Sequence, residues 1–246
     1  MTRLTTFADA EATAARAAVE IARGIELARD QRGVAHLALS GGSTPKRTYE
    51  QLVDALADWD GVEIWFADER CVGPEDEESN YRMAAETLLR PAKIDRARIH
   101  RMIGELGPEE GALRYADELR EHACDPSPSA PTAYAPPVLD LIALGIGPDG
   151  HVASLFPGAP TLDAGERAIC LGVTNSPKPP PERITLSLAV LRVARRCLLL
   201  ATGAGKADAI AAALAEPTKH VPASLLVRER LTVIVDDAAS PPPGLG

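Results

Sequence analysis

The chain has 246 residues and a mass of 26.0 kDa; 46% of the residues are hydrophobic and 25% are charged. This length and composition suit one large α/β domain with a full core. The net charge of -9 argues against a general nucleic-acid binder, which needs a basic face for phosphates. No apolar run reaches the ~20 residues of a membrane span, so neither nucleic acid nor membrane is an expected partner.

Cysteine usage and the first residues of the chain bear on the cellular compartment. The four cysteines are widely spaced and form no C-x-x-C pair, so we expect free thiols and no metal or disulfide role. Residues 1–9 lack the basic, apolar and cleavage-site regions of a secretion signal. The expected location is therefore the cytoplasm, where we expect a monomer or a small homo-oligomer.

Helical and strand patterns alternate along the chain, which indicates a mostly parallel sheet with helices on both faces. In chain order we predict a helix at 9–30, a strand at 34–39, a helix at 45–57, a strand at 62–66, helices at 79–89 and 108–123, strands at 138–144 and 168–173, a helix at 186–193, a strand at 197–201, a helix at 205–214 and a strand at 231–235.

Connecting segments show no change of composition that would mark a second domain. Residues 125–137 are rich in proline, serine and alanine, and 176–181 form a stiff proline-rich connector. We therefore predict a single domain over 1–236, followed by a disordered tail at 237–246.

The most informative segment begins at Gly145, directly after an apolar strand. Gly145, Gly147 and Gly150 let the backbone turn sharply and approach a ligand closely, because they lack a Cβ atom. His151 then lies beyond the carboxyl end of the strand, where open α/β sheets bind their ligands. Its imidazole can act as an acid or a base near neutral pH, so we place the chemistry here.

The same glycines also satisfy the G-x-G-x-x-G pattern of dinucleotide-binding proteins. That pattern needs a helix directly after it and an acidic residue roughly 20 residues further on, which holds the ribose. The next apolar run, 168–173, is followed by Thr-Asn-Ser-Pro without an acid. Pro148 and His151 also occupy positions where a pyrophosphate needs free backbone and space. We therefore do not expect a nicotinamide cofactor.

A second glycine-rich turn lies between a predicted strand and a predicted helix. It consists of Ser40, Gly41, Gly42, Ser43 and Thr44. Glycine amides, hydroxyl groups and the partial positive charge of a helix start are the components of a phosphate cradle. The G-x-x-x-x-G-K-[ST] pattern of a P-loop is absent. An ordinary strand-to-helix turn with Thr44 as N-cap explains the same residues equally well.

Asp68, Glu69 and Arg70 follow the predicted strand at 62–66. A carboxylate pair beside an arginine could orient a base, bind sugar hydroxyls or stabilise an oxyanion. The alternative is a solvated turn with a surface ion pair. Because this triplet shares a sheet edge with the two glycine turns, we favour the functional interpretation.

Two further cations follow predicted turns. Arg183 comes after the proline run, and Lys206 begins a helix after a glycine-rich loop, so either could bind a phosphate. Most such side chains are surface cations. We expect the remaining histidines to be core or surface residues; they are His36, His100, His122 and His220. No histidine spacing typical of a metal site and no G-x-S-x-G elbow is present.

Together these segments resemble the 6-phosphogluconolactonases. The resemblance covers residues 35 to 235 and rests on SGGSTP at 40–45, WFADER at 65–70 with ESNY at 78–81, GIGPDGHVASLFP at 145–157, RITLS at 183–187 and GAGK at 203–206. Each motif is modest alone, but five in this order are specific. The resemblance implies a Rossmann-like fold, which the glucosamine-6-phosphate deaminases share.

Those deaminases are the main alternative. Their sequences continue past the histidine with Asn-Glu-Pro, whose glutamate supports ring opening, whereas residues 153–157 here read ASLFP. The triplet at 68–70 also departs from the Asp-Glu-Tyr type. Both departures favour the lactonase. A non-catalytic sugar-phosphate sensor is a further alternative, which the intact histidine loop disfavours because binding alone needs no titrating group.

The resemblance implies hydrolysis of 6-phospho-D-glucono-1,5-lactone to 6-phospho-D-gluconate in the oxidative pentose phosphate pathway. The phosphosugar lactone would be the small-molecule partner, and neither a metal nor a cofactor is expected. His151 would remove a proton from the attacking water. Asp149 would orient His151, and Arg70 would stabilise the oxyanion.

The same resemblance implies how the sugar phosphate binds. The phosphate would lie on the turn at 40–44, with Arg183 and Lys206 as counter-charges. The other residues expected to bind substrate are Asp68, Asn80 and Gly147.

Overall fold

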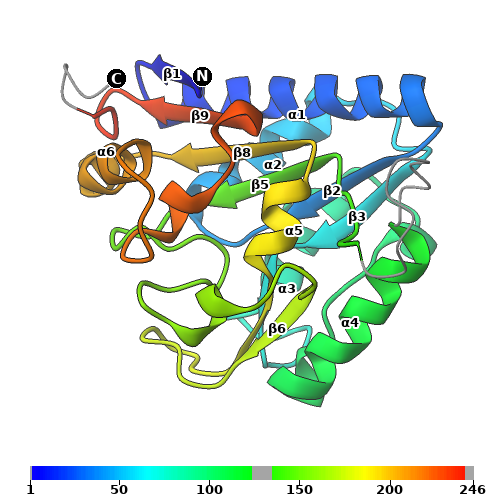
Figure 1. The fold of residues 1–246 in the computed structure, drawn as a ribbon. Helices are drawn as coiled ribbons and strands as arrows, with labels where there is room; N and C mark the ends of the chain where they lie inside the picture. Colours follow the sequence, from blue (N-terminus) through cyan, green and yellow to red (C-terminus); the bar gives the residue numbers. More distant parts are fainter. Residues whose placement is uncertain (1, 124–134, 242–246) are drawn as a thin grey trace.

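The computed structural model describes residues 2–123 and 135–241. Its centre is a six-stranded sheet in the order β1-β9-β8-β5-β2-β3, in which all neighbouring strands are parallel (Figure 1). The strands in this order are β1 (Arg3–Phe7), β9 (Leu231–Asp236), β8 (Arg196–Ala201), β5 (Leu141–Gly145), β2 (Ala35–Leu39) and β3 (Val62–Phe66). The predicted α/β fold with a mostly parallel sheet is confirmed.

The inner strands of this sheet are apolar along almost their whole length. β5, β8 and β9 read LIALG, RCLLLA and LTVIVD, and nearly every residue in them is buried. This pattern arises because helices cover both faces of a parallel sheet, so that side chains pointing either way enter the core.

The helices pack on both sides of the sheet. α1 (Ala10–Arg32) and α2 (Ser43–Ala55) pack against each other and the sheet, and Figure 1 shows α5 (Leu188–Val193) on the opposite face. The remaining helices are α3 (Asn80–Ala84), which continues as a π-helical turn (Ala85–Leu89), α4 (Pro108–His122) and α6 (Ala207–Leu214). Asp9 is the N-cap of α1, and its side chain accepts a hydrogen bond from Ala12 N. The helix ends at Gly33, which adopts the left-handed conformation with a φ of 77°.

A second, three-stranded antiparallel sheet packs below the first, in the order β4-β7-β6. Its strands are β4 (Asp68–Arg70), β7 (Arg183–Leu186) and β6 (Cys170–Val173). The run predicted at 168–173 is thus a strand, but it does not belong to the parallel sheet. β6 and β7 form a hairpin within the long connection from β5 to β8. The short strands β1, β4 and β7 have no predicted counterpart.

The direction of strand addition reverses between β2 and β5. From β2 the chain adds β3 at one edge of the sheet, then returns past β2 and places β5 on its other side. The loops that follow β2 and β5 therefore diverge from adjacent strand ends and leave a crevice between them, which is the usual ligand position in open α/β sheets.

The end of the described chain differs from the expected tail. Residues 237–240 form a turn, Ala239 is fully buried, and the backbone N–H of Asp237 donates to Phe7 O. Residues 242–246 and most of the connector at 125–137 lie outside the described residues. No helix in the described part of the chain is long and apolar enough to cross a bilayer.

Candidate active site

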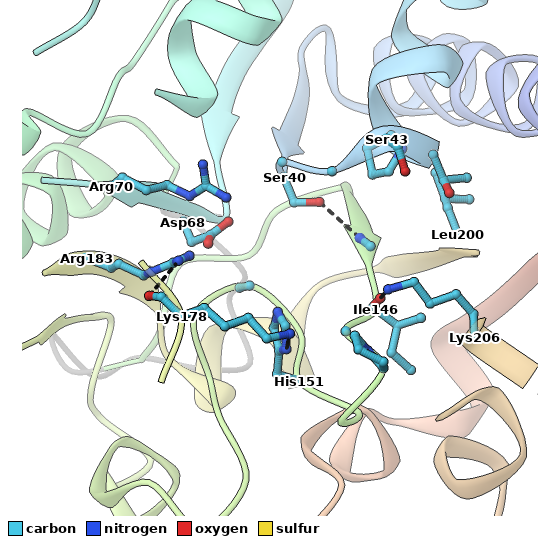
Figure 2. A pocket seen from close by; sticks show the side chains of 18 residues that line it. Ser40, Ser43, Asp68, Arg70, Ile146, His151, Lys178, Arg183, Leu200 and Lys206 are labelled. Carbon is cyan, nitrogen blue, oxygen red and sulfur yellow. Dashed lines mark hydrogen bonds between the residues drawn. The ribbon is translucent and has the colours of Figure 1, made fainter. Parts of the chain in front are cut away.

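A cavity of about 180 Å³ opens at the crevice between β2 and β5 (Figure 2). Most residues predicted for the site line it: Ser40, Gly41, Gly42, Ser43, Thr44, Asp68, Arg70, Gly147, His151, Arg183 and Lys206. Pro45, Gly145, Ile146, Pro148, Ala153, Lys178 and Leu200 complete the lining. The predicted residues Asn80 and Asp149 lie behind this first layer. Turns that are far apart in sequence therefore meet at one rim of the parallel sheet, as expected.

The turn after β2 is held rigidly in place. Ser40 is 3% exposed, and the Tyr49 hydroxyl both accepts from Ser40 N at 2.9 Å and donates to Ser40 O at 3.0 Å. The Ser40 side chain in turn accepts a hydrogen bond from Gly145 N at 3.1 Å. This last contact ties the two glycine turns together across the crevice. Ser40 is therefore a structural link between the turns as well as a lining residue.

α2 begins two residues before its predicted start. Gly42, with a φ of 115°, is the N-cap, and no side chain caps the helix. The interpretation of Thr44 as N-cap is wrong, because glycine alone adopts this backbone conformation readily and lets the helix begin at Ser43. The Thr44 hydroxyl instead hydrogen-bonds the Thr202 hydroxyl at 2.8 Å. The uncapped first turn of α2 faces the cavity with its partial positive charge.

The turn after β5 presents the imidazole of His151. Gly147 N donates to His151 O and Gly150 N donates to Gly147 O, each at 2.9 Å, so the turn folds back on itself. His151 Nδ1 lies 2.6 Å from Asp149 Oδ1. Within the described residues no hydrogen bond engages Nε2. The carboxylate thus holds one ring nitrogen and favours the tautomer in which the other carries a free lone pair.

The protonation of this pair is set by opposing influences. Burial and the positive charge of Lys178 lower the pKa of His151, and the hydrogen bond and charge of Asp149 oppose them without reversing the shift. Burial would raise the pKa of Asp149, but its contacts with His151 and Lys178 bring it below the ordinary value. His151 is therefore neutral and Asp149 ionised near neutral pH, as a general base and its orienting partner should be.

Gly147 is required beside this pair. A Cβ atom built on it would lie 1.9 Å from His151 Nδ1 and 2.3 Å from Asp149 Oδ1. The absence of a side chain at this position is what allows the imidazole and the carboxylate to meet. This steric requirement is distinct from the substrate-binding role predicted for Gly147, which also lines the cavity.

Asp68 is a buried carboxylate whose position is fixed from two sides. It is 4% exposed, and Ser154 Oγ donates to its Oδ2 at 2.7 Å. Asn80 Nδ2 donates to Asp68 O at 2.9 Å. Asn80 therefore does not line the cavity as predicted, because its amide is bound to Asp68 and its oxygen packs against Gly41, where a Cβ would lie 2.1 Å away.

Glu69 does not line the cavity. It is 3% exposed, and its two oxygens accept four hydrogen bonds, from Arg70 N, Ser79 Oγ, Asn80 N and Tyr81 N. Burial nevertheless raises its pKa, and those hydrogen bonds oppose the shift. This side chain joins the end of β4 to the start of α3, so it supports the residues that flank it on both sides.

Three of the four cations that line the cavity fall into two groups (Figure 2). Arg70 and Arg183 lie next to Asp68, while Lys206 lies across the cavity and donates to Ile146 O at 2.7 Å. Burial and the charge of Arg70 lower the pKa of Arg183, and burial and Lys178 lower that of Lys206. Positive charges crowded around one cavity favour the binding of an anion between them.

Lys178 is a lining residue that the sequence analysis missed. Its Nζ lies 3.4 Å from Asp149 Oδ1 and 3.4 Å from His151 Nδ1. The proline run around it predicts a stiff connector, and nothing in one sequence indicates that this connector turns toward the histidine. In the described part of the chain, no group of three or more His, Cys, Asp or Glu side chains could hold a metal ion.

Comparison with known proteins agrees with this geometry. A family model described as glucosamine-6-phosphate isomerases/6-phosphogluconolactonase matches residues 8–235. The chain belongs to this family. A 6-phosphogluconolactonase of Streptomyces coelicolor is 37% identical over 244 residues, which cover 94% of this chain and 91% of that protein. One from Mycobacterium leprae is 35% identical over 248 residues, which cover 97% of each chain.

Solved structures in the family share the whole fold. The 6-phosphogluconolactonase of Trypanosoma cruzi has a TM-score of 0.84 at 25% identity and covers 97% of this chain and 96% of its own. That of Leishmania guyanensis has a TM-score of 0.83 at 29% identity over 97% of both chains. A monomeric glucosamine-6-phosphate deaminase has a TM-score of 0.78 at 22% identity, over 96% of this chain and 98% of its own, which establishes a common fold alone.

Proposed function

We propose that this protein hydrolyses 6-phospho-D-glucono-1,5-lactone to 6-phospho-D-gluconate in the oxidative pentose phosphate pathway. The observation that carries the proposal is the cavity itself, where the free Nε2 side of His151 and an uncapped helix start face the same space. A phosphorylated sugar with an electrophilic carbonyl at its other end matches those two features. The names of the curated relatives at 35–37% identity support the same substrate.

The phosphate binds at the first turn of α2. Backbone N–H groups there have no side-chain cap, and the hydroxyl of Ser43 adds a donor. Lys206 and Arg183 supply positive charge from the cavity walls. A bound anion accepts hydrogen bonds from the uncapped N–H groups of α2. It also reduces the repulsion among the positive charges of the cavity walls.

His151 then acts as the general base at the other end of the sugar. Its Nε2 removes a proton from a water that attacks the lactone carbonyl, and Asp149 stabilises the resulting imidazolium. The protonated ring gives this proton to the departing ring oxygen as the C–O bond breaks. Arg70 stabilises the tetrahedral oxyanion, because it lines the cavity and its Nη2 donates no hydrogen bond to the described residues.

The residues after His151 favour lactone hydrolysis over deamination. Val152, Ala153, Ser154, Leu155 and Phe156 contain no carboxylate, and four of these five side chains are fully or almost fully buried. Ser154, the polar member, is already bound to Asp68. This segment therefore supplies no acid for the ring opening and proton transfer that an amino sugar requires.

Two assays with the same preparation test this function. The rate of hydrolysis of 6-phosphogluconolactone is measured above its spontaneous opening, and glucosamine 6-phosphate is offered separately while ammonia is measured. We expect fast lactone turnover and no ammonia. Ammonia release would assign the chain to the deaminases, and tight binding of 6-phosphogluconate without turnover of any lactone would make it a sugar-phosphate sensor.

The same proposal includes a cytoplasmic location and a monomer or small homo-oligomer. The three cysteines in the described residues form no disulfide, which favours a reducing compartment. Fractionation of cells that express a tagged chain, and light scattering of the purified protein, measure the two properties directly.

A further inference from the structure

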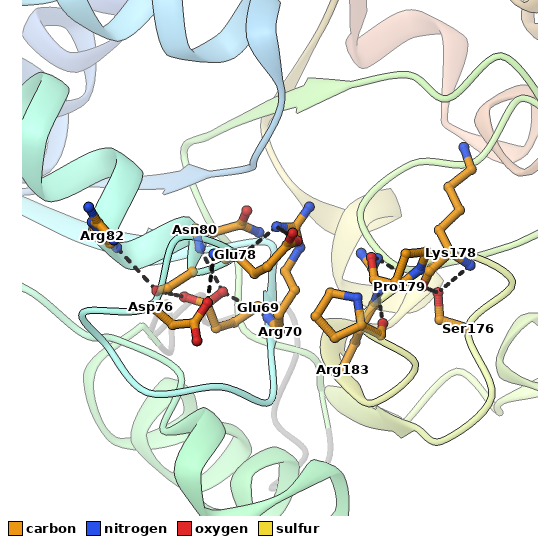
Figure 3. A network of polar contacts seen from close by, with 12 residues as sticks. Glu69, Arg70, Asp76, Glu78, Asn80, Arg82, Ser176, Lys178, Pro179 and Arg183 are labelled. Atoms are coloured by element: carbon orange, nitrogen blue, oxygen red, sulfur yellow. Dashed lines mark hydrogen bonds and ion pairs between the residues drawn. The ribbon is translucent and has the colours of Figure 1, made fainter.

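The connector between β6 and β7 is a built part of the site, although its sequence predicts only a stiff proline-rich connector. We refer to residues 176–181 as the proline strap. Ser176 closes it at its base, because Ser176 N donates to Pro181 O at 2.9 Å and Ser176 Oγ donates to Lys178 O at 2.8 Å. The strap is thus a closed loop at the tip of the β6–β7 hairpin (Figure 3).

The guanidinium group of Arg183 holds the strap in place through hydrogen bonds to its backbone. Its Nε donates to Pro180 O at 3.0 Å, and its Nη2 donates to Pro179 O at 2.9 Å and to Lys178 O at 3.2 Å. Arg183 is 4% exposed, so the arginine side of this clamp is buried, while the strap residues that it holds lie at the surface. One buried guanidinium therefore holds three consecutive carbonyl groups, and the hydrogen bonds of the described residues leave its Nη1 for a ligand.

The clamped strap places the Lys178 ammonium beside the proposed catalytic pair. Lys178 Nζ lies at the same distance, 3.4 Å, from Asp149 Oδ1 and from His151 Nδ1 (Figure 2). It therefore approaches the ring from the nitrogen that Asp149 holds, while Nε2 stays open. Asp149 Oδ1 lies near both His151 Nδ1 and Lys178 Nζ. Because its negative charge also interacts with the Lys178 ammonium, it stabilises a protonated His151 less than it would without Lys178.

We propose that Lys178 is a positioning residue for the His151–Asp149 pair, and that its ammonium keeps the imidazole in the neutral form that can accept a proton from water. This inference rests on the proposed lactone hydrolysis. The ammonium repels the imidazolium, so the proton taken up by Nε2 returns readily to the departing ring oxygen. Lys178 itself gains and loses no proton in this sequence.

Other charged groups also face His151, and they determine which controls are informative. Asp68 approaches from β4 and favours the protonated ring. The remaining cations of the cavity are Arg70, Arg183 and Lys206. Lys206 lies across the cavity, bonded to Ile146 O; among the described residues no hydrogen bond joins it to the His151–Asp149 pair, and it acts on Asp149 only through the longer-range interaction of their charges.

The test compares Lys178→Met with Lys178→Arg and Lys206→Met. In Lys178→Met, we expect the acidic limb of kcat/KM to move to higher pH, because a repulsive charge is lost and Asp149 is left entirely to His151. The loss of activity relative to wild type is then larger near about pH 6 than near about pH 8. Lys178→Arg keeps the charge and restores the limb, whereas Lys206→Met raises KM and leaves the limb in place.

A second readout needs no substrate. NMR titration of the histidine rings, with the His151 signal assigned by its loss in His151→Asn, is expected to show His151 titrating at higher pH in Lys178→Met than in wild type. An unmoved His151 titration and an unmoved acidic limb would overturn the proposal, as would a Lys178→Arg variant that behaves like Lys178→Met. If wild type hydrolyses no lactone, the proposed function fails, and the NMR titration still decides the role of Lys178.

Discussion

The surroundings of His151 and His100 differ in how many ring nitrogens the protein engages. His151 has Nδ1 on Asp149 at 2.6 Å, and its other face opens to the cavity. His100 has Nδ1 on Glu118 at 2.7 Å and Nε2 on Glu63 at 2.9 Å, and its ring stacks on Trp65 with centroids 3.9 Å apart. Both are histidine–carboxylate arrangements, but only the first leaves a lone pair for chemistry.

The pKa shifts of the two rings have opposite directions. For His100, burial opposes the charged form, but the hydrogen bonds to Glu118 and Glu63 outweigh it and raise the pKa. For His151, burial and Lys178 outweigh Asp149 and lower the pKa. A second carboxylate therefore shifts the ring toward the protonated form, in which both nitrogens donate. The comparison shows that the identity of the partners matters less than their number and the charge around them.

Replacement of His151 is expected to have the largest effect on activity. In His151→Asn, kcat/KM for the lactone should fall by ~10²–10⁴-fold, because proton transfer at Nε2 is lost. Steady-state hydrolysis corrected for spontaneous opening measures this loss, and urea unfolding shows whether the fold persists. Wild-type activity in this variant would remove His151 from the mechanism.

A methyl group beside the pair should be almost as harmful. Gly147→Ala would place a Cβ 1.9 Å from His151 Nδ1, so the imidazole or Asp149 must move. We expect kcat to fall on the order of 10²-fold, the cost typical of a displaced catalytic group. Gly165→Ala is the matched control, because nothing lies within 4 Å of the added Cβ there. Equal activity of the two variants would contradict the steric argument.

Replacement of His100 should have the opposite effect to replacement of His151: the protein loses stability and keeps its activity. His100→Asn removes two hydrogen bonds to carboxylates and the stack on Trp65. The free energy of unfolding should fall by about 1–3 kcal/mol, while kcat/KM at 25 °C stays at the wild-type value. Denaturant unfolding and the lactone assay on one preparation separate the two effects. A selective loss of kcat would mean that this cluster communicates with the cavity.

The smallest expected effect is on the pH dependence of stability. His100 has a raised pKa in the folded state, so its contribution is fully present below the unfolded pKa and is lost as pH rises through the folded one. His151 has a lowered pKa, so it penalises folding as pH falls below the unfolded pKa. The free energy of unfolding, measured against pH around the histidine pKa values, should have a slope that His100→Asn and His151→Asn change in opposite directions. Changes of the same sign would contradict the comparison.

The position of the site was predictable from sequence, because the carboxyl ends of parallel strands share one edge. The glycine turns after β2 and β5 identify strand ends, and the structure joins them through Ser40 and Gly145. The antiparallel sheet was not predictable. β4 and β7 have three and four residues, too few to show a period, and their pairing depends on chain segments more than 100 residues apart.

The roles of individual polar residues were harder to predict than their neighbourhood. Asn80 belongs to a motif of the family, but its side-chain amide already donates to the backbone carbonyl of Asp68 at 2.9 Å and to the Asp68 carboxylate at 3.3 Å. Lys178 lies in a segment whose composition is that of a linker, and only the clamp by Arg183 gives it a fixed direction. Such roles depend on which donor satisfies which acceptor in three dimensions, and no local pattern encodes that choice.

The β6–β7 hairpin has a consequence for engineering. It is one uninterrupted stretch of sequence, and it carries Lys178 and Arg183 together with the loop that connects them. Transplanting the corresponding stretch from a relative would exchange this corner of the cavity in a single step, while the start of α2 and the turn that carries His151 stay on the host scaffold. Substrate preference and base strength within this family can therefore be explored as a modular property, one hairpin at a time.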